Sequence, residues 1–178
     1  MAEAFSNKLQ RAAGIVSTST GGSVGILTNL ITGISTVHVA INDLVDTEHF
    51  ICGAKVTAIG VNSTTVDRNS TNTVAATNQN VKYLGVTTAY TSTGTKSILV
   101  GGTFANNTTG SVNLTVSVWD NSASTEVAIA GKIPVPNGSS FVITDAGKTV
   151  LESSDEIRIY CDSANAIDAT LSVLTGVN

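Results

Sequence analysis

The residues that could bind a metal ion or catalyse a reaction are few, and the histidines among them lie in the first half of the chain. His38 and His49 are the two histidines, and His49 lies close to Asp43, Asp46 and Glu48. Imidazole nitrogens and carboxylate oxygens are metal ligands, but this spacing matches no calcium-binding loop. We therefore interpret the acidic group as a solvated loop, and His38, which alternates with valines, as a strand residue facing solvent or a subunit contact.

The second half offers one acidic pair and one tryptophan. Asp155 and Glu156 follow two serines, and a polar turn is a simpler interpretation than a catalytic carboxylate pair, which would need a further positioned group. Trp119 ends an alternating segment on its polar face, as either a lid on the core or an anchor at an interface. The sequence contains no motif of a serine hydrolase, a zinc protease, a phosphate-binding loop or a Cys-x-x-Cys pair. We expect no enzymatic activity, no catalytic residue, no metal ion and no cofactor.

The two cysteines do not define a disulfide framework. Cys161 alternates with Ile157 and Ile159, which predicts a small buried side chain. Whether Cys52 and Cys161 pair stays open, because a chain of 178 residues can be stable without a disulfide.

Neutral polar residues dominate the composition. Ser, Thr and Asn supply 60 of the 178 residues, charged residues only 12%, and the formal net charge is −4. Because the chain has no cluster of basic residues for phosphate groups, we expect no nucleic-acid partner. We also expect no membrane association, because the start lacks a secretory pattern and no apolar run is long enough to span a bilayer. Neutral hydroxyls and amides cost less to desolvate than ions, so this composition favours surfaces that are buried against other proteins.

Residues 1–23 are predicted to form an N-terminal arm that begins with a short helix. The four-residue spacing of Phe5 and Leu9 places both on one helix face, and Gly14 can end the helix. The Ser, Thr and Gly tract at 17–23 is typical of a flexible link.

This arm is expected to dock either on the body of its own chain or on a neighbouring subunit, because a helix of about 12 residues is marginal on its own. Phe5, Leu9 and Arg11 are the candidate interface residues on the arm, and Trp119 is the candidate in the second half.

The rest of the chain is predicted to be all β. Alternating apolar residues at 35–41 and around 56–67 predict the short strands of a small β-roll or barrel module, assigned to residues 24–79. Residues 80–178 are predicted to form an antiparallel β-sandwich of about eight strands, jelly-roll or Ig-like, with the two prolines at an edge. The predicted strands of the sandwich are 81–91, 96–105, 111–119, 126–133, 139–144, 149–152, 156–161 and 167–174.

Several segments resemble small β-sandwich virion proteins of tailed bacteriophages. The likeness lies in residues 133–143 (IPVPNGSSFVI), 150–159 (VLESSDEIRI) and 169–174 (ATLSVL), an ordered set of an apolar-proline turn, a Leu-Glu-x-x-Asp turn and a terminal strand. Residues 53–60 (GAKVTAIG) and 66–71 (VDRNST) are similar to a small β module of phage structural proteins, notably those of cyanobacterial phages. The pattern consists of turns and contains no catalytic signature.

The resemblance implies a non-enzymatic structural protein of a phage particle, located in the virion and assembled in the host cytoplasm. A capsid decoration (cement) or neck protein is the leading interpretation, and a tail or tail-fibre component or a module binding a host-surface glycan is the alternative. The implied partners are copies of the chain itself, by analogy as a trimer, and other virion proteins of the capsid, neck or tail. Head, neck or tail location stays open at this point.

Overall fold

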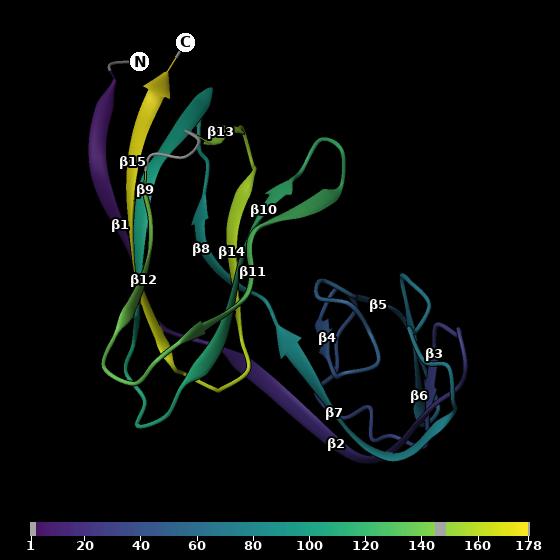
Figure 1. Cartoon of the computed structure of the whole chain (residues 1–178). Coiled ribbons are helices and arrows are strands. Elements are labelled where there is room, and N and C mark those ends of the chain that lie inside the picture. Colours follow the sequence, from purple (N-terminus) through teal and green to yellow (C-terminus); the bar gives the residue numbers. More distant parts are fainter. Residues whose placement is uncertain (1–2, 145–148, 178) are drawn as a thin grey trace. The chain divides into compact units, whose positions relative to one another are not determined.

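The computed structural model describes residues 3–144 and 149–177, and within these ranges the chain contains strands and no helix. The chain divides into two compact units (Figure 1). The sandwich unit comprises residues 1–14 and 87–178, and the small unit comprises residues 15–86. Among the described residues there is accordingly no helix long and apolar enough to cross a membrane.

The sandwich unit consists of two antiparallel sheets. The β1 sheet has the order β1-β15-β9-β12, with β13 also paired to β9, and the β8 sheet has the order β11-β10-β14-β8. The strands of this unit are β1 (Ala4–Ala13), β8 (Thr87–Thr91), β9 (Lys96–Asn106), β10 (Val112–Asp120), β11 (Thr125–Val135), β12 (Ser140–Ile143), β13 (Thr149–Glu152), β14 (Glu156–Cys161) and β15 (Ile167–Val177).

The strand pairing is that of one long hairpin folded over into two sheets. β1 pairs with β15, β8 with β14, β9 with β12 and β13, and β10 with β11. This nested order is the connectivity of a jelly roll. The small unit is inserted in the chain between β1 and β8, the first connection of the jelly roll. The all-β class and the antiparallel sandwich are confirmed.

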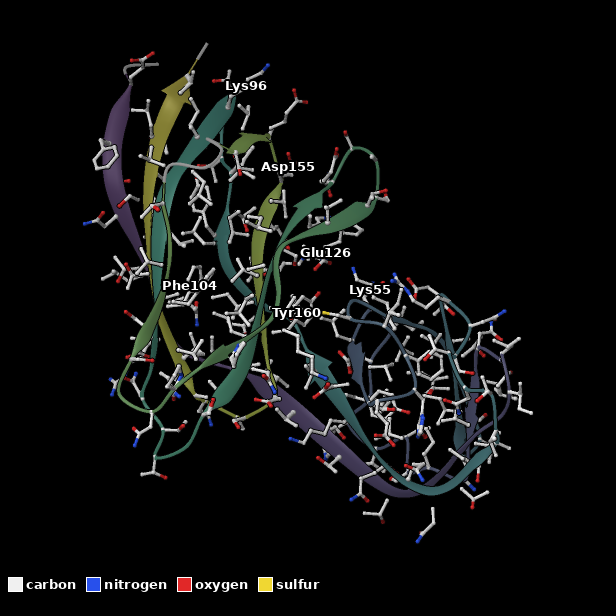
Figure 2. All side chains as sticks on the ribbon, viewed as in Figure 1. Lys55, Lys96, Phe104, Glu126, Asp155 and Tyr160 are labelled. Atoms are coloured by element: carbon white, nitrogen blue, oxygen red, sulfur yellow. The ribbon has the colours of Figure 1, made fainter. Side chains whose placement is uncertain are left out.

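Alternating side chains of both sheets fill a single core between them. Phe104 of β9, Leu114 of β10 and Leu171 of β15 are almost fully buried there, and Figure 2 labels Phe104 among the core side chains. Cys161 is also buried in this core, as its alternation with isoleucines predicts. No disulfide joins Cys52, which is exposed, to Cys161, so the pairing left open by the sequence is not formed. The proline-containing strand β11 lies at a sheet edge, where the missing backbone donors cost least.

The small unit is a six-stranded antiparallel sheet that closes on itself. The order is β4-β7-β2-β3-β6-β5. The two ends of this order are joined by backbone hydrogen bonds, from Val45 N to Ala54 O at 2.8 Å and from Val56 N to Asp43 O at 3.0 Å. The closed sheet surrounds its own apolar core, as the predicted roll or barrel requires. The strands are β2 (Ile15–Val24), β3 (Leu30–Thr32), β4 (Leu44–Asp46), β5 (Val56–Gly60), β6 (Ser63–Val66) and β7 (Ala76–Gly85).

Tyr83 in the core of the small unit makes stability sensitive to high pH. Its hydroxyl lies 2.9 Å from the Thr64 hydroxyl, and burial raises the pKa of Tyr83 to about 12 against the opposing effect of that hydrogen bond. Because the folded-state pKa is raised, the stabilisation is fully present below the ordinary tyrosine pKa of about 10 and is lost as the pH rises from there through 12. We expect urea unfolding to show this loss, and a Tyr83→Phe variant to lose less stability over the same interval. Equal losses in both proteins would contradict the assignment.

The predicted N-terminal helical arm is wrong. Residues 4–13 form β1, which pairs with β15, and residues 15–24 form β2, an inner strand between β7 and β3. A spacing of four places Phe5 and Leu9 on one face of a strand as well as of a helix, so the local pattern fits both structures. Pairing with β15, at the other end of the chain, favours the strand over the helix, and the local sequence of residues 4–13 does not indicate that partner. The Ser, Thr and Gly tract is part of β2, where a Cβ atom at Gly22 would lie only 3.1 Å from side-chain atoms of both Ile34 and Val81.

Deleting residues 1–23 is therefore expected to unfold the protein. The deletion removes the edge strand β1 and nearly all of β2, which opens the closed sheet of the small unit. Circular dichroism should show loss of cooperative thermal unfolding, and the variant should aggregate. A deletion of residues 1–3 alone, which ends before β1, serves as the control and should unfold as the intact protein does. A soluble, cooperatively folded 1–23 deletion would contradict the strand assignment.

The other segments of the small unit fit the sequence prediction only partly. Strands β5 and β6 lie within the predicted 56–67 region, but the predicted strand at 35–41 is a series of turns. His38 has a φ of 64° and Asn42 a φ of 74°, and strands do not accommodate either value. The short strands β3 and β4, of three residues each, lack a detectable alternation and were missed.

Candidate interaction surface

The outward side of the β1 sheet carries a row of apolar side chains that crosses four strands. The register places Phe5 of β1 beside Leu174 of β15, Leu174 beside Ile98 of β9, and Ile98 beside Val150 of β13. Phe5 is 63% exposed and Val150 53%, while Leu174 and Ile98 are half-buried. Paired residues of an antiparallel sheet point to the same side, so these four side chains form one band.

A second row crosses the same sheet four residues away. It runs from Leu9, which is 74% exposed, through Thr170 and Thr103 to Val142. Asn7 and Ser172 lie between the two rows and bond to each other, with the Ser172 hydroxyl 3.2 Å from the Asn7 amide oxygen. We call the two rows and the residues between them the apolar face. On the outward side, no Asp, Glu, Lys or Arg lies between the two rows in the described register of these strands, and Lys8 of β1 points to the inward side.

Charged residues border the apolar face at both ends. At one end Lys96 and Glu152 form an exposed ion pair at 3.6 Å, and Figure 2 shows Lys96 beyond the sandwich core. At the other end Asp168 accepts a hydrogen bond from the backbone N–H of Ala12 at 2.7 Å, with Arg11 exposed nearby. The face is five residues long and four strands wide, so strand and inter-strand spacings give it a size of about 17 Å by 19 Å, roughly 320 Å². Stable interfaces bury about 800 Å² on each partner, so this face is about two-fifths of one interface.

Burial of this face would be favourable but modest. Four of the six apolar side chains in the two rows are 48–74% exposed and the other two are half-buried, and full burial of all six would contribute roughly 6 kcal/mol. Association costs an estimated 4–15 kcal/mol or more in lost freedom. One such face therefore supports only a weak contact between two proteins. An assembly that repeats the contact many times would be held together more strongly.

The outward side of the other sheet carries a polar network instead. The Arg158 guanidinium donates to Glu126 Oε2 at 3.0 Å and to Glu156 Oε2 at 2.7 Å, and the Tyr160 hydroxyl donates to Glu126 Oε2 at 3.2 Å. The Ser117 hydroxyl donates to the other oxygen of Glu126. Figure 2 shows Glu126 and Tyr160 close together on this unit. The Glu126 side chain is only 3% exposed, so its charge depends on these partners.

The protonation states of this network are held by its own hydrogen bonds. Burial, followed by the neighbouring Glu126 carboxylate, raises the pKa of Tyr160 well above its usual range, so the phenol stays neutral. Burial opposes the charge of Arg158, but its hydrogen bonds to Glu156 and Glu126 outweigh that effect and raise its pKa. Tyr160 therefore stays neutral and Arg158 stays charged near neutral pH, which suits a structural role.

The structure places three of the four candidate interface residues together. Phe5 and Leu9 lie in the two rows of the apolar face, and Arg11 is exposed on the same strand. Trp119 lies on the other sheet, half-buried, with the Arg158 guanidinium 4.3 Å from the centre of its ring. The structure thus does not bring Trp119 to the same surface.

Sequence reasoning missed four residues of the apolar face: Ile98, Val142, Val150 and Leu174. Each is directly next to another apolar residue on its strand, and neighbouring residues on a strand point to opposite sides. A pair such as Val150 and Leu151 must therefore expose one member, and here Leu151 is buried while Val150 is not. Two consecutive apolar residues in a predicted strand were therefore the sequence signal that one of them faces outward.

The residues considered for chemistry have structural contacts. His49 Nε2 lies 3.1 Å from Gln79 Oε1, and His38 is exposed on a turn. Asp155 is buried and accepts hydrogen bonds from the backbone N–H groups of Asn121 and Glu152 at 3.0 and 2.8 Å, which fixes two turns. Across residues 3–144 and 149–177, no three His, Cys, Asp or Glu residues are grouped as a metal site would need.

Comparison with known proteins finds similarity only among solved structures. No protein-family model and no curated protein matches the chain. Among solved structures, the chain is similar to a chain in the crystal structure of the T13 IBDV viral particle, with 9% sequence identity and a TM-score of 0.37. The match covers 94% of this chain and 70% of that chain. The neighbour comes from a virus particle, but a likeness at this level supports no functional assignment by itself.

Proposed function

We propose that this protein is a non-enzymatic structural component of a tailed-phage particle, a capsid decoration or neck protein that acts through contacts with copies of itself and with other virion proteins. The apolar face carries the proposal. It is a sheet surface of neutral and apolar side chains, bordered by charges, on a chain whose charged content is only 12%. Such a surface loses little on desolvation and gains apolar burial when another protein covers it.

Two further observations support a role in a particle. Jelly rolls are common in viral capsid proteins, although lectins and cupins share the architecture, so this support is an analogy of fold. The turn segments that resemble phage virion proteins lie in the sandwich unit, where residues 133–143 include β12 and residues 150–159 span the end of β13 and most of β14. Decoration or neck is the finer part of the proposal and follows from that resemblance.

The test is incorporation of apolar-face variants into particles. The combined Phe5→Asp and Val150→Asp variant changes two exposed positions of the face, and Val127→Asp, 65% exposed on the opposite sheet, is the matched control. We expect the face variant to stay folded but to be lost from particles purified from the producing culture, while the control co-sediments with them. Immunogold labelling then distinguishes the head surface from the neck and the tail. Equal incorporation of both variants, or a native protein absent from particles, would overturn the proposal.

A further inference from the structure

Strand β1 has a free side. It lies at the end of the β1 sheet, and in the described part of the chain β15 is the one strand paired with it (Figure 1). An edge strand of ten residues presents backbone N–H and C=O groups to which another strand can bond. Phe5, Asn7 and Leu9 alternate on the outward side, which is the side of the apolar face, and the exposed Arg11 follows at the register shift after Gln10.

The charges near the two ends of β1 are opposite and lack ion-pair partners. Glu3 precedes the strand and Arg11 lies near its other end, and both are exposed. Within residues 3–144 and 149–177, neither side chain takes part in an ion pair. Two copies of β1 aligned antiparallel would therefore bring each Glu3 toward the opposite charge of a neighbouring strand.

One antiparallel register between two copies matches the apolar residues of β1 and brings its oppositely charged ends together. With the twofold axis at Asn7, Phe5 lies opposite Leu9 of the second copy, and this pair occurs twice. Glu3, which precedes β1, then lies near Arg11 of the second copy, which follows Gln10 at the register shift of β1. Cross-strand apolar pairs and opposite charges both stabilise a sheet. Lys8, on the inward side, then lies opposite Ser6 of the second copy.

The neighbouring registers are less favourable. An axis at Lys8 would place two lysines opposite each other and Phe5 opposite Arg11. An axis at Ser6 would place Leu9 opposite Glu3. Like charges directly opposite each other destabilise a sheet, so Lys8 selects against the first of these alternatives.

We propose that two copies of this chain pair through β1 in the register centred on Asn7. The pairing joins two β1 sheets into one and continues the Phe5 row of one copy into the Leu9 row of the other across eight strands. The combined apolar face would then measure roughly 640 Å², twice that of one copy. This inference rests on the proposed assembly function, because it names the partner that completes the surface.

Cysteine substitution at the axis tests the register directly. In a Cys52→Ser background, which removes the exposed native thiol, Asn7→Cys places two thiols opposite each other. Paired residues across antiparallel strands lie about 4.5–5.5 Å apart between Cα atoms, which is within the range for a disulfide. We expect rapid formation of a covalent dimer under mild oxidation. Leu9→Cys is the matched control in the same strand, and it should cross-link far more slowly because it faces Phe5.

Charge exchange provides a second measurement on the same pairing. Glu3→Arg or Arg11→Glu alone should weaken the dimer about tenfold in sedimentation-velocity experiments, because each change creates two like-charged pairs. The double variant with both exchanges should restore the affinity of the native chain. Three results would overturn the inference. The native chain could stay monomeric, the cross-link could form preferentially at a position other than Asn7, or the double variant could dimerise as weakly as the single variants. Dimers without incorporation into particles would refute the proposed function alone, and incorporation without this dimer would refute the inference alone.

Discussion

Replacing Arg158 with methionine is expected to lower the free energy of unfolding by about 3 kcal/mol. Methionine fills much of the same space but removes the guanidinium that bonds to both Glu126 and Glu156. The Glu126 side chain is 3% exposed, so its charge loses a partner in a place that water hardly reaches. Trp119 also loses the cation stacked on its ring. Because Trp119 is the single tryptophan, its fluorescence during urea unfolding reports on the sandwich unit.

Two further variants separate charge burial from a general surface effect. Lys96→Met breaks the exposed pair with Glu152, whose side chains are 49% and 63% exposed, and should cost less than about 0.5 kcal/mol. Adding Glu126→Gln to Arg158→Met should recover much of the lost stability, because the uncompensated charge is then removed. If Lys96→Met and Arg158→Met cost the same, burial of the Glu126 charge is not what makes Arg158 important.

The strands of the sandwich unit could be predicted because each carries its own evidence. Residues such as Val112, Leu114 and Val116 alternate with polar neighbours, and turn residues separate the strands at regular intervals. The predicted strands of 96–105, 149–152 and 156–161 agree with β9, β13 and β14 to within a residue. A sheet with one buried side imposes this alternation on every strand, so local sequence is sufficient there.

The N-terminal strands could not be predicted, because their structure depends on distant partners. The inward residues of β1 are Ser6, Lys8 and Gln10, and the outward ones include Phe5 and Leu9, so the usual order of polar outside and apolar inside is reversed. β2 carries small and polar residues typical of a linker, although it is an inner strand of the closed sheet. The candidate surface was found only in part for the same reason. Phe5 and Leu9 stand out in the sequence, but the row they belong to is formed by register with β15, β9, β12 and β13.

Gly14→Ala is expected to destabilise the sandwich unit by at least about 3 kcal/mol. Gly14 does not end a helix but follows β1, with a φ of 124° that side-chain-bearing residues rarely adopt. A Cβ atom there would overlap the carbonyl oxygen of Ser163 and lie 3.2 Å from the backbone nitrogen of Asn165. That nitrogen donates to Gly14 O at 3.0 Å, so the segment cannot move away without losing this bond. Urea unfolding followed by Trp119 fluorescence measures the loss.

Two other glycines separate backbone strain from steric overlap in this prediction. Gly138 has a φ of 68° but open space around a Cβ position, so Gly138→Ala should cost only about 1 kcal/mol from strain. Gly110 has open space and no positive φ, so Gly110→Ala should change the stability by no more than about 0.5 kcal/mol. A Gly14→Ala cost no greater than that of Gly138→Ala would mean that the contact with Ser163 relaxes freely. The end of β1, and with it the alignment of Phe5 and Leu9, would then be less firmly held than its backbone contacts imply.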